Sequence, residues 1–562
     1  MEWQGIAKDA RSKVLDAIPS TWCLDSKWTS QTASSVIDIP RNSGVLTKRQ
    51  LDITDQSLVQ LVVNLARGIL TSVEVTEAFC ARAAIAHQLA RLRFPRQTNC
   101  LTAFFPEEAI DAAKACDAHY AATGKVIGPL HGIPLAIKDQ YNVKGHPSTL
   151  GYIANYGNAA QDDAAIVKVL RDSGAVIFAK TTMPQTGMAL ETTSNLWGRT
   201  INPYNRELAS GGSSGGDAVL VAMRGSPVSP SSDIGGSIRA PAAFNGHYSI
   251  RPSADRICKT GMATTLSGQI SIKVSCGPVC HSLDDLKLFI KVINAYPSMQ
   301  FAPGVVPLPW RDVETPKRKL TFALWDFDSV CMPHPPILRA LKETANKLTA
   351  AGHEVVNVDL PFDCWTVALT TWKIYFQTGA VEMKAKLAEG GEDMLPSLKY
   401  HLEAFGIKPL SAAEAFGLNR EMSEYKTAMS HWWSTSSSRT DSGRPFDAII
   451  APVHPSTSYP HNFASWWGYT TIWNILDYPS LTIPIKKFKI SPETDPKDLD
   501  YRPMDNKFDK ATYEMYDPEL FANQPVCLQV VGRPFQDEEI VAVAEVFDGV
   551  VNPPTWRLED YN

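Results

Sequence analysis

Short apolar runs alternate with amphipathic segments along most of the chain. Between several of these runs, apolar residues recur with the spacing of a helix, at 165–171 and from Pro336 to Gly352. The alternation predicts an α/β fold, a single large α/β/α domain in which helices cover a mixed central sheet. Pro484 indicates that its strand lies at a sheet edge or ends there. Strands are predicted at 133–137, 175–179, 320–325, 355–358, 448–451, 481–485 and 526–531.

Three parts of the chain stand apart from this alternation. Residues 1–55 are predicted to form a peripheral N-terminal extension of a main domain at 56–562, and apolar spacing indicates one amphipathic helix at 3–18. The segments 434–443 and 486–517 are rich in charged residues, serine or proline. Both are predicted to be surface loops and not boundaries between domains.

A pair of helices is predicted directly after the extension. The first runs towards Gly68, with Thr54 or Asp55 as its N-cap. The second begins after Thr71, because Glu74 lies three residues later and completes a capping box. Both helices are expected to be part of the scaffold.

The overall composition is that of an ordinary globular protein and disfavours several functional classes. The 562 residues are 44% apolar and 20% charged, and 54 basic against 59 acidic residues give a net charge of −5. This balance provides no basic surface for nucleic acid or an anionic membrane. No segment has the ~18 consecutive apolar residues of a transmembrane span, and the first residues lack the apolar core of a secretory signal. A cytoplasmic location is therefore predicted.

The ten cysteines form no metal-binding pattern. No pair has the C-x-x-C spacing, and Cys276 and Cys280 have no histidine at a distance typical of zinc sites. Because intracellular thiols stay reduced, buried free cysteines are expected. No metal site is predicted.

Two glycine–serine clusters, Gly211–Gly216 and Ser232–Pro241, are the most informative motifs. The first alone is compatible with a flexible turn or a phosphate-binding loop, although no Gly-Lys-Ser/Thr ending follows. It also fits the nucleophile elbow of α/β-hydrolases around Ser213, which would require an acidic residue and then a histidine downstream. The first cluster by itself leaves these interpretations open.

The second cluster favours a different arrangement. Two glycines precede Ser237, and their conformational freedom allows consecutive backbone N–H groups to converge on one negatively charged oxygen. A serine at the end of such a loop is well placed to attack a carbonyl group whose oxygen the loop holds. Asp233 and Arg239 flank the loop and are predicted to form an ion pair that fixes its shape.

Further motifs stand in register with these clusters: Gly132-x-Pro134-x-x-x-Lys138-Asp139 upstream and Arg251-Pro-Ser253 downstream. Ser213 follows Lys138 by 75 positions, and Ser237 follows Ser213 by 24. Together these motifs resemble the amidase signature family, and the resemblance extends from about residue 55 to the end of the chain. Within the family, the sequence is most similar to fungal acetamidase-type enzymes.

The resemblance implies a Ser–Ser–Lys triad. Ser237 resembles the nucleophile, Lys138 the base, and Ser213 the bridging serine that follows a cis peptide bond to Gly212. Burial of a lysine in an apolar site favours its neutral amine, which can accept a proton near neutral pH. His131, close to the lysine motif, is expected to serve packing or a turn. The oxyanion is expected to be held by backbone N–H groups of Ile234, Gly235, Gly236 and Ser237.

The resemblance also indicates a substrate-binding pocket. It places Gly187, Met188 and Ala189 beside Ser213 in that pocket. Gly187 either provides extra room there or serves a backbone turn. An aromatic cluster later in the chain either covers the cleft or belongs to the core; its members are Trp466, Trp467, Tyr469 and Trp473.

These features predict an amidase that hydrolyses a small carboxylic amide through an acyl-enzyme, without a cofactor, in a catalytic domain at 56–562. The alternative is a biosynthetic acyltransferase or amidase of the same fold. A glutaminase subunit of a tRNA-dependent amidotransferase is disfavoured by the long extension and the lack of a basic patch. A non-catalytic binding module is disfavoured by the intact triad. The expected partner is a small-molecule amide, and a homodimer remains open.

Overall fold

The computed structural model describes residues 3–29, 34–89, 98–296 and 302–553. The seven strands predicted from apolar runs are all present, with ends shifted by at most two residues. The described strands are β1 (Leu101–Phe104), β2 (Pro134–Lys138), β3 (Val176–Thr181), β4 (Thr193–Ser194), β5 (Gly198–Arg199), β6 (Val228–Asp233), β7 (Tyr248–Arg251), β8 (Ser275–Cys280), β9 (Thr321–Leu324), β10 (Glu354–Asn357), β11 (Ala448–Pro452), β12 (Ser480–Pro484) and β13 (Cys527–Val531).

The largest sheet is mixed and has eight strands in the order β10-β9-β11-β13-β12-β7-β8-β6. β9 pairs in parallel with β10 and β11, and the other neighbours are antiparallel. Successive side chains of a strand point to opposite faces of a sheet. In β9, Phe322 belongs to one hydrophobic core and Ala323 to another. Both faces of the sheet are therefore buried.

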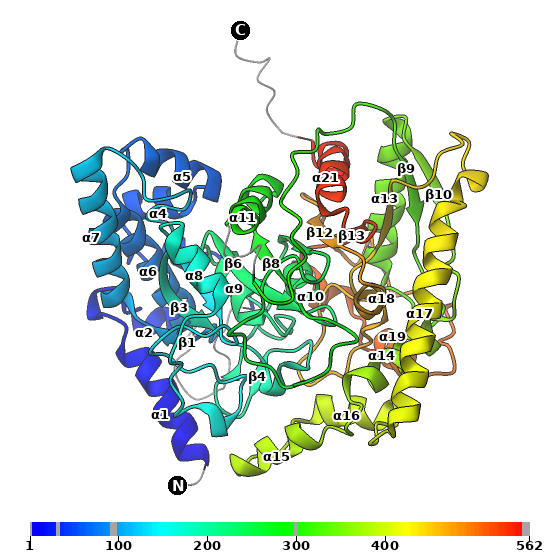
Figure 1. Ribbon diagram of the computed structural model, residues 1–562, viewed down its shortest axis with the longest axis horizontal. Helices are drawn as coiled ribbons and strands as arrows, with labels where there is room; N and C mark the ends of the chain where they lie inside the picture. Colours follow the sequence, from blue (N-terminus) through cyan, green and yellow to red (C-terminus); the bar gives the residue numbers. More distant parts are fainter. Residues whose placement is uncertain (1–2, 30–33, 90–97, 297–301, 554–562) are drawn as a thin grey trace.

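Helices cover both faces, which confirms the predicted α/β/α layers. The described α-helices are α1 (Trp3–Asp16), α2 (Ser26–Thr29), α3 (Ile39–Asn42), α4 (Lys48–Thr54), α5 (Leu58–Ala66), α6 (Ser72–Gln88), α7 (Pro106–Thr123), α8 (Ala165–Asp172), α9 (Gly215–Ala222), α10 (Arg239–Phe244), α11 (Leu283–Ala295), α13 (Pro335–Ala350), α14 (Cys364–Tyr375), α15 (Val381–Glu389), α16 (Pro396–Ala404), α17 (Ala412–Ser434), α18 (Gly468–Leu476), α19 (Lys507–Met515), α20 (Pro518–Phe521) and α21 (Asp537–Val551). α11, α13 and α21 share the core of Phe322, and α10, α14, α17 and α18 share that of Ala323. Figure 1 shows α4 to α7 on the side of the molecule opposite β9 and β10.

β2 and β3 belong to a separate three-stranded sheet with the order β1-β3-β2. β2 still lies beside β6. At this junction the Ser229 hydroxyl donates to the carbonyl of Ala136, and the Ser226 hydroxyl accepts from the N–H of Ala136. Side-chain hydroxyl groups thus take the place of a backbone ladder, so the strands predicted for one central sheet are divided between two sheets.

The helix pair near the N-terminus confirms one of the two predicted caps. Thr71 caps α6 in a complete capping box. The prediction of Thr54 or Asp55 as the N-cap of the preceding helix is wrong, because Ser57 caps α5 and Gln60 completes its capping box. Thr54 instead ends the separate helix α4.

Pro484 ends its strand and does not mark a sheet edge. β12 lies inside the large sheet, paired with β13 on one side and β7 on the other. The pairing with β7 stops at Thr482, two residues before the proline. Because proline has no N–H with which to continue a ladder, the strand finishes at this position.

β6, β7 and β8 lack the apolar runs that indicate the other long strands. They are rich in serine, proline, glycine and cysteine, yet all of their residues are buried. Pro230 is compatible with β6 because β6 is the terminal strand of its sheet. Hydrophobic patterning therefore misses the strand that leads into the second glycine–serine cluster.

The aromatic cluster belongs to the core. Its four residues are each at most 4% exposed and pack with Trp325 and Trp372 on the face covered by α14 and α18. None of the four lines the cavity described below. The core interpretation of this cluster is therefore the correct one of the two.

None of the ten cysteines, all of which lie in the described ranges, forms a disulfide bond; Cys23 is exposed and the other nine are buried. Among the residues that the structure describes, no group of three or more histidine, cysteine, aspartate and glutamate side chains could hold a metal ion. In the same ranges, no helix has both the length and the apolar character needed to cross a membrane.

Brief proteolysis should cut the chain first at its surface segments. Residues 441–445 are exposed, and so are most residues of 486–506 between β12 and α19. We expect subtilisin to cut within 434–445 or 486–506 before the other described segments, because cleavage requires an accessible, locally open chain. Mass spectrometry of the first fragments would identify the sites. Two stable halves of similar size, in place of a nicked single body, would contradict the single-domain fold.

Candidate active site

Three segments meet where β2 and β6 lie side by side. Lys138 is the last residue of β2, Ser213 lies just before α9, and Ser237 lies in the loop between β6 and α10. The peptide bond between Gly212 and Ser213 is cis, as the family resemblance implies. All three side chains of the predicted triad are buried. The fold thus brings the lysine motif and both glycine–serine clusters to one place.

The amino group of Lys138 is surrounded by hydroxyl groups. Its Nζ atom lies 2.8 Å from Oγ of Ser213, 2.8 Å from Oγ of Ser214 and 2.9 Å from Oγ of Ser232. Among the described residues, the carboxylates of Asp217, Asp233 and Asp139 lie near this amino group and act on it through their charge, without contacting it. Burial lowers the pKa of Lys138 to about 8, although these carboxylates oppose the shift. A considerable fraction of the amino group is therefore neutral near pH 8.

Asp217, in the first turn of α9, provides one of these carboxylates. It is buried and accepts hydrogen bonds from Oγ1 of Thr181 at 2.6 Å and from Oγ of Ser229 at 2.5 Å. Burial raises the pKa of Asp217 to about 6. Since Thr181 lies on β3 and Ser229 on β6, Asp217 joins α9 to both sheets and so fixes the helix that follows Ser213.

A buried ion pair holds the loop between β6 and α10. Asp233 contacts Arg239 through two hydrogen bonds of 3.0 Å, and neither side chain is exposed. The same carboxylate accepts from the N–H groups of Gly236 at 2.8 Å and Ile238 at 3.1 Å, and from Asn474 at 2.9 Å. Burial alone would raise the pKa of Asp233, but Arg239 and Asn474 hold it well below its usual value. The predicted ion pair is confirmed.

Gly236 occupies a position that requires glycine. Its φ is 122°, and a Cβ atom there would lie 2.5 Å from Oγ1 of Thr470. The N–H of Gly236 is one of the four expected oxyanion donors. In the structure it instead donates a hydrogen bond to Asp233. In the described part of the chain, no acceptor is bound to the N–H groups of Ile234, Gly235 and Ser237.

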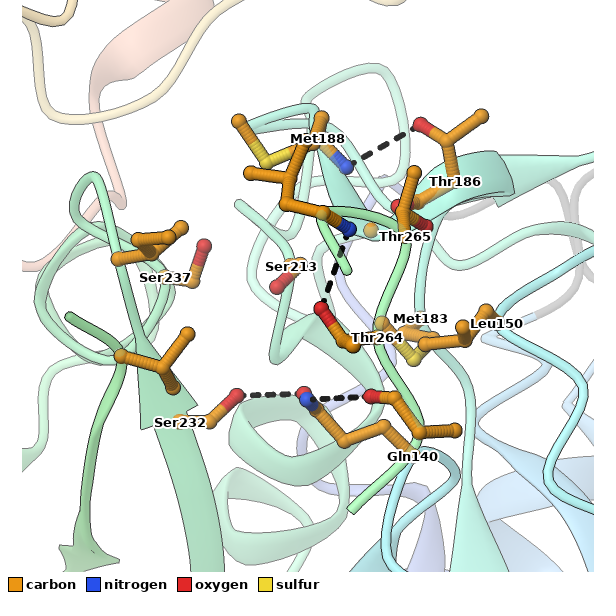
Figure 2. A pocket seen from close by; sticks show the side chains of 15 residues that line it. Gln140, Leu150, Met183, Thr186, Met188, Ser213, Ser232, Ser237, Thr264 and Thr265 are labelled. Atoms are coloured by element: carbon orange, nitrogen blue, oxygen red, sulfur yellow. Dashed lines mark hydrogen bonds between the residues drawn. The ribbon is translucent and has the colours of Figure 1, made fainter. Parts of the chain in front are cut away.

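A cavity of about 40 Å³ opens beside the two serines. Figure 2 shows Ser213 and Ser237 on neighbouring parts of its wall. Among the other residues predicted for the site, the wall includes Ile234, Gly187 and Met188. It does not include Gly235, Gly236 or Ala189, although Ala189 is buried.

Sequence patterns do not reveal several other wall residues. Gln140 accepts a hydrogen bond from the Ser232 hydroxyl at 2.5 Å and donates to the carbonyl of Ala263 at 3.4 Å. Its place two residues after Lys138 is the one signal that could have indicated it. The remaining wall residues have no such signal, because only tertiary contacts bring them to the cavity; they include Leu150, Met183, Thr264, Thr265 and Leu266.

Gly187 serves a backbone turn. Its φ is 73°, at the end of the short helix Gln185–Gly187. A Cβ atom at this position would lie 2.9 Å from the terminal methyl group of Met183. Gly187 therefore occupies a backbone turn, as one of its two interpretations predicts, and it also lines the cavity.

Within the described ranges, no histidine lines the cavity. Nδ1 of His131 accepts from the N–H of Ile127 at 3.2 Å, and burial lowers the pKa of His131. Burial also lowers the pKa of His247 to about 4, so this ring stays neutral at physiological pH. The nucleophile-elbow interpretation of Ser213 therefore lacks the histidine that it requires.

The family model for amidases matches residues 74–541. The chain belongs to the amidase family. This amidase is an amide hydrolase that acts on carbon–nitrogen bonds. It is 49% identical to an amidase of Gibberella zeae over 98% of this chain and 100% of that protein. It is 36% identical to an acetamidase of Emericella nidulans over 97% of each chain. The resemblance to fungal acetamidase-type enzymes is thus confirmed.

Solved structures show the same relationship. The amidase superposes on a fatty acid amide hydrolase with a TM-score of 0.90 and 32% identity, covering 98% of this chain and 95% of that chain. A bacterial aryl acylamidase has the same fold, with a TM-score of 0.70 at 20% identity over 89% of this chain and 97% of that chain. The α/β fold of the amidase is therefore that of its family.

Arg239→Met should destabilise the amidase, because it leaves the Asp233 carboxylate buried without its counter-ion. Removal of one partner of a buried ion pair costs about 3–5 kcal/mol. Arg41→Met is the control, since the Arg41 side chain is 55% exposed and its partner Asp55 also pairs with Arg82. This change should stay within about 1 kcal/mol. Urea unfolding would measure both variants, and equal small losses would show that the buried pair does not hold the loop.

Proposed function

We propose that this amidase hydrolyses a small carboxylic amide through an acyl-enzyme on Ser237, with Ser213 and Lys138 as its proton relay. The observation that carries the proposal is the 2.8 Å contact between Nζ of Lys138 and Oγ of Ser213, in a buried site whose cavity both serines line. The lowered pKa of Lys138, about 8, supports its role as a base. No cofactor takes part in the proposed steps.

The first half of the reaction forms the acyl-enzyme. Neutral Lys138 accepts a proton from Ser213, which accepts the proton of Ser237 as the Ser237 oxygen attacks the amide carbon. The tetrahedral intermediate then collapses: Ser213 gives its proton to the departing nitrogen and takes one back from protonated Lys138. Ammonia or an amine leaves, and the acyl group remains on Ser237.

Backbone N–H groups stabilise the negative oxygen of the intermediate. The donors that support this proposal are the N–H groups of Ile234, Gly235 and Ser237, which are free in the described part of the chain. The N–H of Gly236 is bound to Asp233 and instead holds the loop in shape. Fixed donors aimed at a developing charge are among the largest contributions to catalysis.

The second half of the reaction releases the acid. Water takes the place of the departed amine, gives a proton to Ser213 and so towards Lys138, and attacks the ester carbon of the acyl-enzyme. The intermediate collapses, Ser237 regains a proton from Ser213 as Lys138 returns one to Ser213, and the carboxylic acid leaves. The same relay therefore serves both halves of the reaction.

The size of the cavity supports a short acyl group. A cavity of about 40 Å³ holds about three water molecules, comparable to a small carboxamide. Met183, Met188 and Leu150 give it apolar walls that suit a methyl or short alkyl group. Two relatives at 37% and 36% identity are named acetamidases, which supports the same choice.

Ser237 should be the residue that becomes acylated. A fluorophosphonate probe should label Ser237, identified by mass spectrometry of the digested protein. Ser237→Ala should abolish both labelling and amide turnover while leaving the melting temperature near that of the wild type, because only one hydroxyl group is removed. Labelling on Ser213 would favour the nucleophile-elbow interpretation instead.

Amide turnover should depend on the protonation of Lys138. Only the neutral amine can accept the serine proton, so kcat/KM should rise with pH up to about 8 and then level off. A histidine base would give a plateau above its usual pKa of about 6.5. Stopped assays of ammonia release between pH 5.5 and 9.5 would distinguish the two profiles. Lys138→Ala should lower kcat/KM on an amide by ~10²–10⁴, and less on an ester, whose leaving group needs less protonation.

Lys180 provides a matched control for this prediction. It is a second buried lysine whose pKa burial lowers to about 8, but its amino group donates to the carbonyl of Pro147 and the hydroxyl of Ser148, away from the triad. Lys180→Met should therefore keep the wild-type pH profile when activity is expressed per folded molecule. A loss of less than about tenfold in Lys138→Ala would contradict its assignment as general base.

A further inference from the structure

Tyr375, the last residue of α14, contacts the loop that carries Ser237. It is 2% exposed, and its hydroxyl group donates a hydrogen bond to the carbonyl of Ile234. A Cβ atom on Gly235 would lie 3.3 Å from the same hydroxyl, which shows how closely the tyrosine approaches the loop. Tyr375 also lines a second cavity of about 160 Å³, which shares Thr265 and Leu266 with the first.

The contact at Ile234 controls the direction of one backbone N–H group. A peptide unit is planar and normally trans, so its C=O and N–H bonds point in opposite directions. The carbonyl of Ile234 and the N–H of Gly235 belong to the same unit. When Tyr375 holds this carbonyl on its own side, the N–H of Gly235 must point away from Tyr375.

The next peptide unit is held in the same way. Oγ1 of Thr470, on α18, donates to the carbonyl of Gly235 at 2.8 Å, and the N–H of that unit, on Gly236, donates to Asp233 at 2.8 Å. Two hydroxyl groups from two helices therefore fix two consecutive peptide units. This restraint matters here because glycine adopts many backbone conformations and would otherwise leave the units free to rotate.

We propose that Tyr375 is a positioning residue for the reaction, whose hydroxyl group aligns the N–H of Gly235 with the developing oxyanion. The proposal rests on the proposed function, since it takes Ser237 as the nucleophile. Tyr375 touches neither the nucleophile nor the base; it acts through one peptide unit. Burial raises the pKa of Tyr375, so the phenol keeps its proton and remains a donor over the pH range of the assays.

Packing alone is the other role that Tyr375 could have. Its ring contacts the rings of Trp372 and Phe376 in the aromatic core. Tyr375→Phe separates the two roles, because it keeps the ring and removes only the hydroxyl group. A packing role predicts little change in rate, whereas a positioning role predicts a change confined to the transition state.

The expected result for Tyr375→Phe is a fall in kcat of about 10- to 100-fold on an amide, with KM within about twofold, since loss of a whole oxyanion donor costs ~10²–10³. A trifluoromethyl ketone, to which Ser237 adds to form a tetrahedral oxyanion, should bind more weakly by a similar factor. The corresponding alcohol, which forms no oxyanion, should bind as it does to the wild type.

Tyr516→Phe is the matched control. Tyr516 is also buried, and its hydroxyl donates to a backbone carbonyl, that of Asp495, at 2.7 Å. It does not line the cavity beside Ser237. Both variants should lose a similar amount of thermal stability, but Tyr516→Phe should keep the wild-type kcat and affinity for the ketone.

Either of two results would overturn the inference: a wild-type kcat in Tyr375→Phe, or equal losses of affinity for the ketone and for the alcohol. Fluorophosphonate labelling of the wild type keeps the two proposals distinct. If Ser237 is not labelled, the proposed function fails and this inference fails with it. If Ser237 is labelled and Tyr375→Phe matches the wild type, only the role of Tyr375 is refuted.

Discussion

Burial of a single amino group imposes the arrangement of the site. Nζ of Lys138 has three serine hydroxyl groups as partners, and these satisfy its hydrogen bonds without the strong stabilisation of charge that a contacting carboxylate would provide. A buried amino group without polar partners would be costly, so the surroundings must supply hydroxyl groups in a largely dry interior. Serine-rich segments that would be unusual in a hydrophobic core are therefore required around this lysine.

The division between the two sheets creates the place for these hydroxyl groups. Because β2 and β6 are joined through the side chains of Ser226 and Ser229 and not by a backbone ladder, polar side chains occupy the space between them. Asp217 ties α9 to the same junction, and the Asp233–Arg239 pair holds the loop after β6. The groups of the site are thus attached to rigid elements on all sides, which is what precise positioning of reacting atoms requires.

Local patterns predict those parts of the structure whose causes are local. Apolar runs indicate seven strands, and the Thr71 capping box places the start of α6. The true cap of α5 has the same signature in Ser57 and Gln60, which Thr54 and Asp55 lack. Motif spacing indicates the three residues of the proposed triad, but it cannot show that Asp233 accepts from the N–H of Gly236, or that Tyr375 reaches Ile234 across 141 positions. Such contacts depend on how distant segments pack.

Much of the cavity wall comes from stretches of the chain other than those that carry the groups proposed to react. The hydroxyl and amino groups are supplied by β2 and the two glycine–serine clusters, whereas much of the wall is supplied by Leu150, Met183, Met188 and the segment around Thr265. Substitutions in this part of the wall can alter which acyl group fits without disturbing the proposed proton relay. Within one lineage, substrate preference is therefore free to diverge through a few loop residues while the chemistry is inherited unchanged.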